Sequence, residues 1–117
     1  MNLLDCTFRD GSLDFGCFSM RLSVDAAARI GPHGPELSLG IRPEFVRTSK
    51  EEQAGWPRME VRLVENMGTH KVLILGMDGL TIKSRVPDDM PVAEGSTIWV
   101  DFPEDRMKIF RGTEKIM

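Results

Sequence analysis

The feature that most constrains the fold is the strict alternation of apolar and polar residues in the second half of the chain. It is clearest in residues 80–86, where Leu, Ile, Ser and Val occupy every second position, a pattern typical of a half-buried strand. The dipeptide Asp78-Gly79 just before this segment is a strong signal for a tight β-hairpin. Residues 59–111 contain five such short segments separated by turn residues. Five strands are typical of a small Greek-key barrel of the oligonucleotide/oligosaccharide-binding (OB) type, although other small barrels and sandwiches show the same periodicity.

The first of these segments carries an irregularity. Met59, Val61 and Leu63 alternate with charged residues, and Val64 then breaks the alternation. We therefore predict a β-bulge, or the end of the strand, at this point.

The N-terminal part predicts further β-structure with one short helix. Residues 1–22 indicate a pair of short strands around the turn at residues 10–12. Residues 24–30 predict a helix of about two turns, capped by Ser23 or Asp25 and ended by Gly-Pro. Residues 39–46 predict a strand that runs into a turn stiffened by Pro43.

We therefore expect an all-β protein: an OB-like five-stranded barrel with an additional N-terminal β-hairpin segment. Its expected organisation is a β segment in residues 1–46 that packs on the barrel, a loop in 47–58, and the barrel in 59–117.

Composition narrows the functional classes. The 117 residues are 41% hydrophobic and 28% charged with a net charge of −3, which is typical of a globular protein and argues against a nucleic-acid-binding module. No signal peptide and no apolar run near the roughly 20 residues of a membrane span are visible. We expect Cys6 and Cys17 to be reduced thiols in a cytosolic protein.

The sequence contains no compact motif for nucleotide, dinucleotide or zinc chemistry, and it predicts no cofactor, no metal site and no enzymatic activity. His33 and His70 lack a metal-ligand spacing, and the acidic pairs 51–52 and 88–89 fall in loops, where such residues are common. The aromatic residues are scattered, which favours core packing over a base-stacking platform. Trp99 is the exception, because it lies out of phase with its apolar neighbours and is expected on the outer face, as at a protein interface.

A set of motifs in a particular order resembles a known family. These motifs are Leu39-Gly40-Ile41-Arg42-Pro43-Glu44, Val64-Glu65-Asn66-Met67-Gly68-Thr69-His70, Ser84-Arg85-Val86-Pro87, the Glu94-Gly95 turn and Ile109-Phe110. They are similar to the C-terminal TOBE/OB-like domain of sugar-type ABC importer ATPases, the maltose and glycerol-3-phosphate uptake class. Asn66 and Met67 depart from the Pro-Leu that the family commonly has before the glycine, and His70 replaces an acidic or small residue.

The resemblance implies a non-catalytic regulatory or dimerisation domain, because the Walker, signature and switch motifs of that family lie upstream and are absent here. The chain would then be an excised accessory domain or the product of a truncated gene. The implied partners are the ATPase core, a second copy of the subunit in a homodimer, and a regulatory protein, without nucleic acid or membrane insertion. The implied location is cytoplasmic, at the inner membrane through the transporter complex.

The residue patterns and the resemblance together nominate binding residues. Arg42 and Glu44 are expected to orient the module, either as a local ion pair or as a docking contact. Residues 68–70 (Gly68, Thr69 and His70) are expected in a barrel loop near a partner, and Trp99 on an interface. The alternative is a stand-alone small-ligand or oxyanion-binding barrel, in which main-chain amides around Gly68 would form an anion nest.

Overall fold

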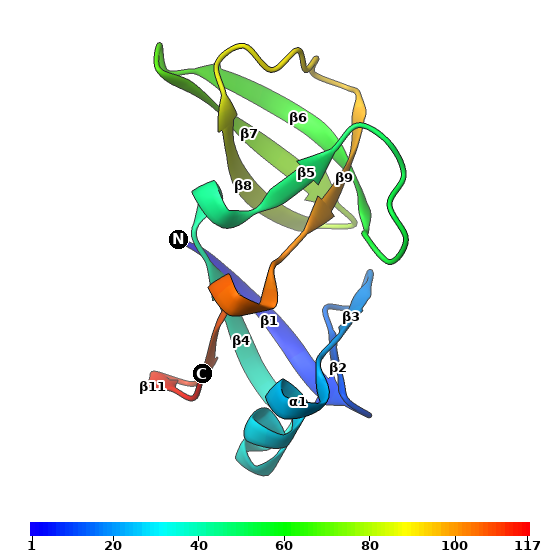
Figure 1. The fold of residues 1–117 in the computed structure, drawn as a ribbon, viewed down its shortest axis with the longest axis vertical. Coiled ribbons are helices and arrows are strands. Elements are labelled where there is room, and N and C mark those ends of the chain that lie inside the picture. The colour runs from blue at the N-terminus through cyan, green and yellow to red at the C-terminus, as the bar shows by residue number, and fades with distance from the viewer. The chain divides into compact units, whose positions relative to one another are not determined.

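The computed structural model describes residues 1–117 and consists mainly of two antiparallel sheets (Figure 1). By contacts the chain divides into two units, one made of residues 1–41 with 104–117 and the other of residues 42–103. The first unit contains β1 (Asn2–Arg9), β2 (Ser12–Asp14), β3 (Ser19–Arg21), α1 (Val24–Ile30), the 3₁₀ helices η1 (Gly31–His33) and η3 (Glu104–Arg106), β4 (Glu36–Ile41), β10 (Lys108–Arg111) and β11 (Glu114–Lys115). The second contains the 3₁₀ helix η2 (Pro43–Phe45), β5 (Arg47–Ser49), β6 (Arg58–Asn66), β7 (His70–Met77), β8 (Leu80–Pro87) and β9 (Thr97–Asp101).

The first unit is built on a six-stranded sheet in the order β11-β10-β4-β1-β2-β3. Leu39 on β4 lies opposite Leu4 on β1 and Ile109 on β10. All three side chains are almost completely buried, as is Ile30 at the end of α1. The predicted strand around Ile109 is therefore present, but its placement in the barrel was wrong, because its hydrogen bonds are made with β4.

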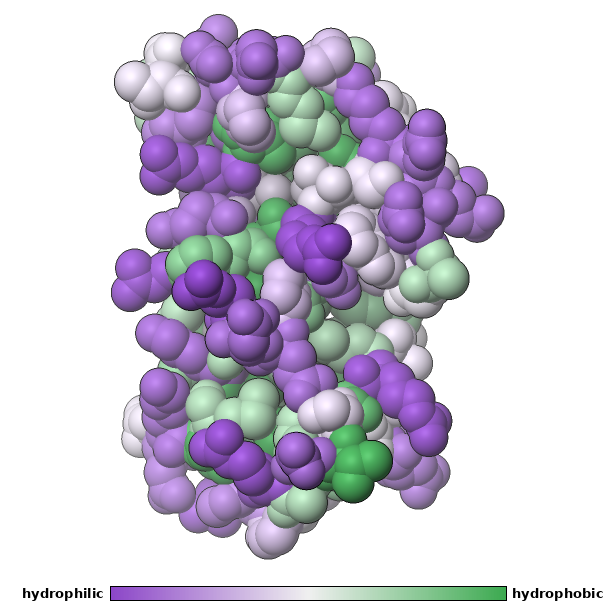
Figure 2. All heavy atoms as spheres, viewed as in Figure 1, coloured by the Kyte–Doolittle hydropathy of each residue, from purple (hydrophilic) through white to green (hydrophobic).

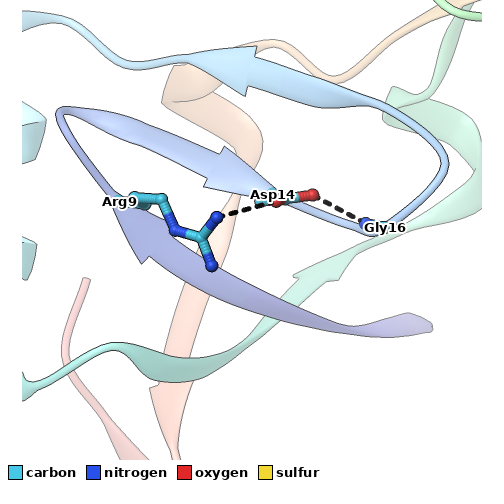
Figure 3. A network of polar contacts seen from close by, with 3 residues as sticks. All are labelled: Arg9, Asp14 and Gly16. Carbon is cyan, nitrogen blue, oxygen red and sulfur yellow. Dashed lines mark hydrogen bonds and ion pairs between the residues drawn. The ribbon is translucent and has the colours of Figure 1, made fainter.

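The hairpin between β1 and β2 follows the turn chemistry of the sequence. Asp10 and Gly11 both have positive φ, 51° and 76°, as a two-residue hairpin turn requires. Close to this hairpin, the Asp14 carboxylate accepts a hydrogen bond from the Gly16 amide at 2.8 Å and lies 4.0 Å from the Arg9 guanidinium (Figure 3). Gly16, at φ 91°, lies in a second turn, in which the Phe15 amide donates a hydrogen bond to the Phe18 carbonyl at 2.8 Å.

Helix α1 has seven residues, as predicted, and Ser23 is its N-cap. The Ser23 hydroxyl accepts a hydrogen bond from the Ala26 amide at 3.2 Å, which satisfies one of the free N–H groups of the first turn. No helix in the structure is long and apolar enough to span a membrane.

The second unit is built on a five-stranded sheet in the order β5-β9-β6-β7-β8. Strands β6, β7 and β8 form a meander, and the predicted Asp78-Gly79 turn joins the last two with positive φ at both residues. The core of this unit comes from alternating inward positions, which are Met59, Val61, Leu73, Leu75, Ile82, Val86, Ile98 and Val100. The OB-like strand meander is thus confirmed, although strands β5 and β8 at the two edges do not pair into a closed barrel.

Two boundaries differ from the sequence prediction. The strand predicted for residues 39–46 covers Glu36–Ile41 and gives way to η2, since Pro43 has the fixed φ that suits the first turn of a helix. The segment 47–58 is not wholly a loop, because residues 47–49 pair with β9 as strand β5. The element η2 packs against the edge strand β8, where the buried Ser84 hydroxyl donates to the Val46 carbonyl at 3.3 Å.

The predicted bulge is present in β6, where the pairing with β7 shifts between Val61 and Leu63. Arg62 is the extra residue, so Arg62 and Leu63 both lie on the outer side of the sheet. The alternation had placed Leu63 inward, and this was wrong because the bulge reverses the parity of the strand.

Candidate interaction sites

Arg42 and Glu44 flank the start of η2. Arg42 is the residue before the 3₁₀ helix, with extended φ and ψ of −74° and 144°, and Glu44 lies within it. Both side chains are exposed, and no ion pair joins them. The local ion-pair interpretation is therefore not supported by the geometry, and both charges are open to solvent.

Residues 67–69 form the loop between β6 and β7. Gly68 has φ 89°, and its amide donates to the Asn66 side chain at 2.9 Å. The Met67 amide donates to the His70 carbonyl at 2.9 Å, and the Thr69 hydroxyl lies 2.9 Å from His70 Nδ1. Because two of the three loop amides are used inside the hairpin, the loop does not present the converging amides of an anion nest.

Trp99 lies on β9 between Ser49 of β5 and Arg58 of β6. Its neighbours Ile98 and Val100 are buried in the core, whereas Trp99 is half-buried on the other face. The structure therefore places Trp99 on the outer side of this sheet, as the alternation predicted.

A second aromatic site was missed by the sequence analysis. The guanidinium of Arg47 lies 5.1 Å from the ring centre of Trp56 and 3.6 Å from the Asp101 carboxylate. Burial raises the pKa of Asp101 above its ordinary value, an effect that the Arg47 charge and a hydrogen bond from the Phe102 amide partly oppose. Only the pairing of β5 with β9 brings Arg47 to Asp101, so no local sequence signal reveals this group.

The remaining reactive residues are isolated. Both cysteines are free thiols, and burial together with the neighbouring Asp5 raises the pKa of Cys6 to about 11. No group of three or more His, Cys, Asp and Glu side chains is arranged to hold a metal ion.

The fold and the motifs together match a known class. The TOBE domain family matches residues 39–110, which is more than half of the chain. This chain belongs to the TOBE domain family.

Two relatives specify the kind of TOBE domain. The trehalose/maltose import ATP-binding protein MalK of Thermococcus litoralis is 32% identical over 97% of this chain and 33% of its own length. The sn-glycerol-3-phosphate import ATP-binding protein UgpC of Salmonella paratyphi A is 29% identical over 96% of this chain and 31% of its own length. The predicted resemblance to sugar-type ABC importer ATP-binding subunits is thereby confirmed, and the chain spans about a third of the length of these relatives.

A solved structure shares the fold. The cytoplasmic molybdate-binding protein ModG, with molybdate bound, aligns with a TM-score of 0.71 over 92% of this chain and 94% of that one. The sequence identity is 11%, so this similarity concerns the fold and not the ligand.

Proposed function

We propose that this chain acts as the non-catalytic accessory domain of the ATP-binding subunit of a sugar-class ABC importer. The observation that carries the proposal is similarity over at least 96% of the chain to two import ATP-binding proteins with different solutes. These 117 residues contain no Walker or signature motif. The proposed role is therefore exerted through protein contacts and not through ATP hydrolysis by this chain.

The proposed contacts are with the ATPase core, with a second copy of the subunit and with a regulatory protein. The exposed Arg42 and Glu44, the Gly68–His70 hairpin loop and the outer face of Trp99 are the proposed contact residues. In this role the domain would keep two ATPase subunits associated while their nucleotide sites open and close, at the cytoplasmic side of the inner membrane.

A chimera tests the proposal. The matching third of the Thermococcus litoralis protein is replaced by this chain, and the same protein without that third serves as the control. We expect the chimera to form dimers and to support coupled transport better than the truncated control, as measured by light scattering and solute uptake. A chimera that behaves like the truncated protein would overturn the proposal.

The second candidate is a small-ligand or oxyanion-binding barrel, supported by the fold that this chain shares with a molybdate-binding protein. The engaged amides of Met67 and Gly68 weigh against the predicted nest. Thermal unfolding with molybdate, sulfate or a sugar phosphate separates the two candidates. A saturable rise in Tm would favour the ligand-binding barrel.

A further inference from the structure

The outer side of strands β6, β7 and β8 carries a surface that is distinct from the contact residues proposed above. One row across these three strands consists of Leu63, Ile74 and Lys83. A second row on the same side consists of Glu65, Val72 and Arg85. We call these six residues, together with Arg62 on the bulge, the basic–apolar face. They are Arg62, Leu63, Glu65, Val72, Ile74, Lys83 and Arg85.

The centre of this face is aliphatic. Leu63 is 44% exposed, although it lies within a nine-residue strand, and Ile74 and Val72 are half-buried beside it. The bulge at Arg62 explains the exposure of Leu63, because without the bulge this side chain would point into the core. The sheet therefore presents a short aliphatic strip to the outside, where it costs hydration free energy unless it is covered.

The guanidinium of Arg62 is held flat against the sheet beside this strip. A Cβ atom added to Gly76 would lie 2.0 Å from the Arg62 guanidinium carbon, so the guanidinium occupies the space that any other residue would fill. Arg62 also lies 3.5 Å from the Thr81 hydroxyl and 3.9 Å from the Glu60 carboxylate. These contacts fix one cation at the margin of the strip in a position that is still 42% exposed.

The charge on the face is opposite to that of the whole chain. The face has three basic residues and one acidic residue, and Glu60 beside Arg62 adds a second carboxylate. The surface is therefore still net positive, whereas the chain has 15 Lys and Arg against 18 Asp and Glu. We infer that the basic–apolar face is a docking surface for a protein segment that carries acidic side chains around aliphatic ones. An oligonucleotide fits less well, because none of the seven residues is aromatic and could stack on a base.

The inference rests on the proposed function in one respect, namely that the chain acts through protein contacts. It is tested on the chain alone, so that its outcome is separate from that of the chimera. The probe is a labelled peptide of about ten residues that alternates Glu with Leu and Val and matches a strand of this sheet in length. The same peptide with Lys in place of Glu is the first control, and an oligothymidine of similar length is the second.

Binding is measured by fluorescence polarisation, and the site is mapped by methyl NMR shifts of leucine, isoleucine and valine. We expect the acidic peptide alone to bind, with shifts centred on Leu63, Val72 and Ile74. Equal binding of the Lys peptide, binding of the oligothymidine instead, shifts elsewhere, or no binding would each overturn the inference.

Three variants sharpen the test. Leu63→Ser should weaken binding by about tenfold, because it removes the most exposed aliphatic side chain of the face. Gly76→Ala should also weaken it, by displacing the guanidinium of Arg62; the protein should stay folded, since the clashing atoms are the flexible end of a side chain. Leu3→Ser, at an exposed leucine of the other sheet, is the matched control and should leave binding unchanged. Unaltered binding by both Leu63→Ser and Gly76→Ala would contradict the inference.

Discussion

Ser23 and Glu104 are 81 residues apart in the chain and are joined by two hydrogen bonds. The Ser23 amide donates to one carboxylate oxygen of Glu104 at 3.0 Å, and the Ser23 hydroxyl donates to the other. The same hydroxyl accepts from the Ala26 amide, so one side chain both caps α1 and binds the returning C-terminal segment. The N-terminal helix is thereby tied to the residues that lead back into the first sheet.

This double role predicts a measurable loss of stability. Ser23→Ala should lower the free energy of unfolding by about 1 kcal/mol, as expected for the loss of a serine N-cap. Glu104→Gln retains one acceptor for the Ser23 donors and should cost less. Urea unfolding followed by circular dichroism measures both, and a Ser23→Ala variant as stable as the parent would contradict the proposed cap.

The two cysteines should differ in reactivity. The pKa of Cys6 is raised to about 11 by burial and by Asp5, so its thiol is protonated and shielded at neutral pH. Iodoacetamide should therefore modify Cys17 in the folded protein and reach Cys6 only after denaturation, as mass spectrometry would record. Cys17→Ser is the control and should be unmodified until the chain unfolds.

Asp101 should make the free energy of unfolding depend on pH in the acid range. Burial raises the pKa of this carboxyl in the folded state above its ordinary value of 3.8. The folded state therefore binds the proton of Asp101 more tightly than the unfolded chain does. The resulting contribution to the free energy of unfolding is fully present below pH 3.8 and is lost as pH rises through the folded pKa. As pH increases to neutrality, Asp101→Asn should gain stability relative to the parent.

Arg47→Gln supplies the control for this measurement. It removes the cation that partly lowers the pKa of Asp101, so this variant should lose more stability than the parent as pH rises through the acid range. Identical pH profiles of the parent and Asp101→Asn would show that burial does not shift this carboxyl.

The contact between Ser84 and Val46 should stabilise the second unit. The Ser84 side chain is fully buried, and it satisfies the Val46 carbonyl after η2. Ser84→Ala leaves that carbonyl without this donor and should cost about 1 kcal/mol of unfolding free energy. Thr97→Ala, at an exposed strand position, is the matched control, and equal losses in both variants would argue against a specific bridge.

Local chemistry in the sequence determined much of the secondary structure. The Asp78-Gly79 turn, the seven-residue helix with its Ser23 cap and the alternation along β8 follow from short-range propensities, because turn, cap and pleat each depend on a few neighbouring residues. The order of motifs also identified the TOBE family correctly.

Strand partnership was decided only by the tertiary structure. Periodicity tells which side of a strand is apolar, but not which sheet the strand will join, and β10 illustrates this by pairing with β4. The bulge at Arg62 is a similar case, since the sequence indicated an irregularity but only the pairing with β7 showed that Leu63 faces outward. Contacts such as Arg47 with Asp101 depend on residues that are distant in the chain, because long-range pairing is selected by the burial of the whole core and not by any local segment.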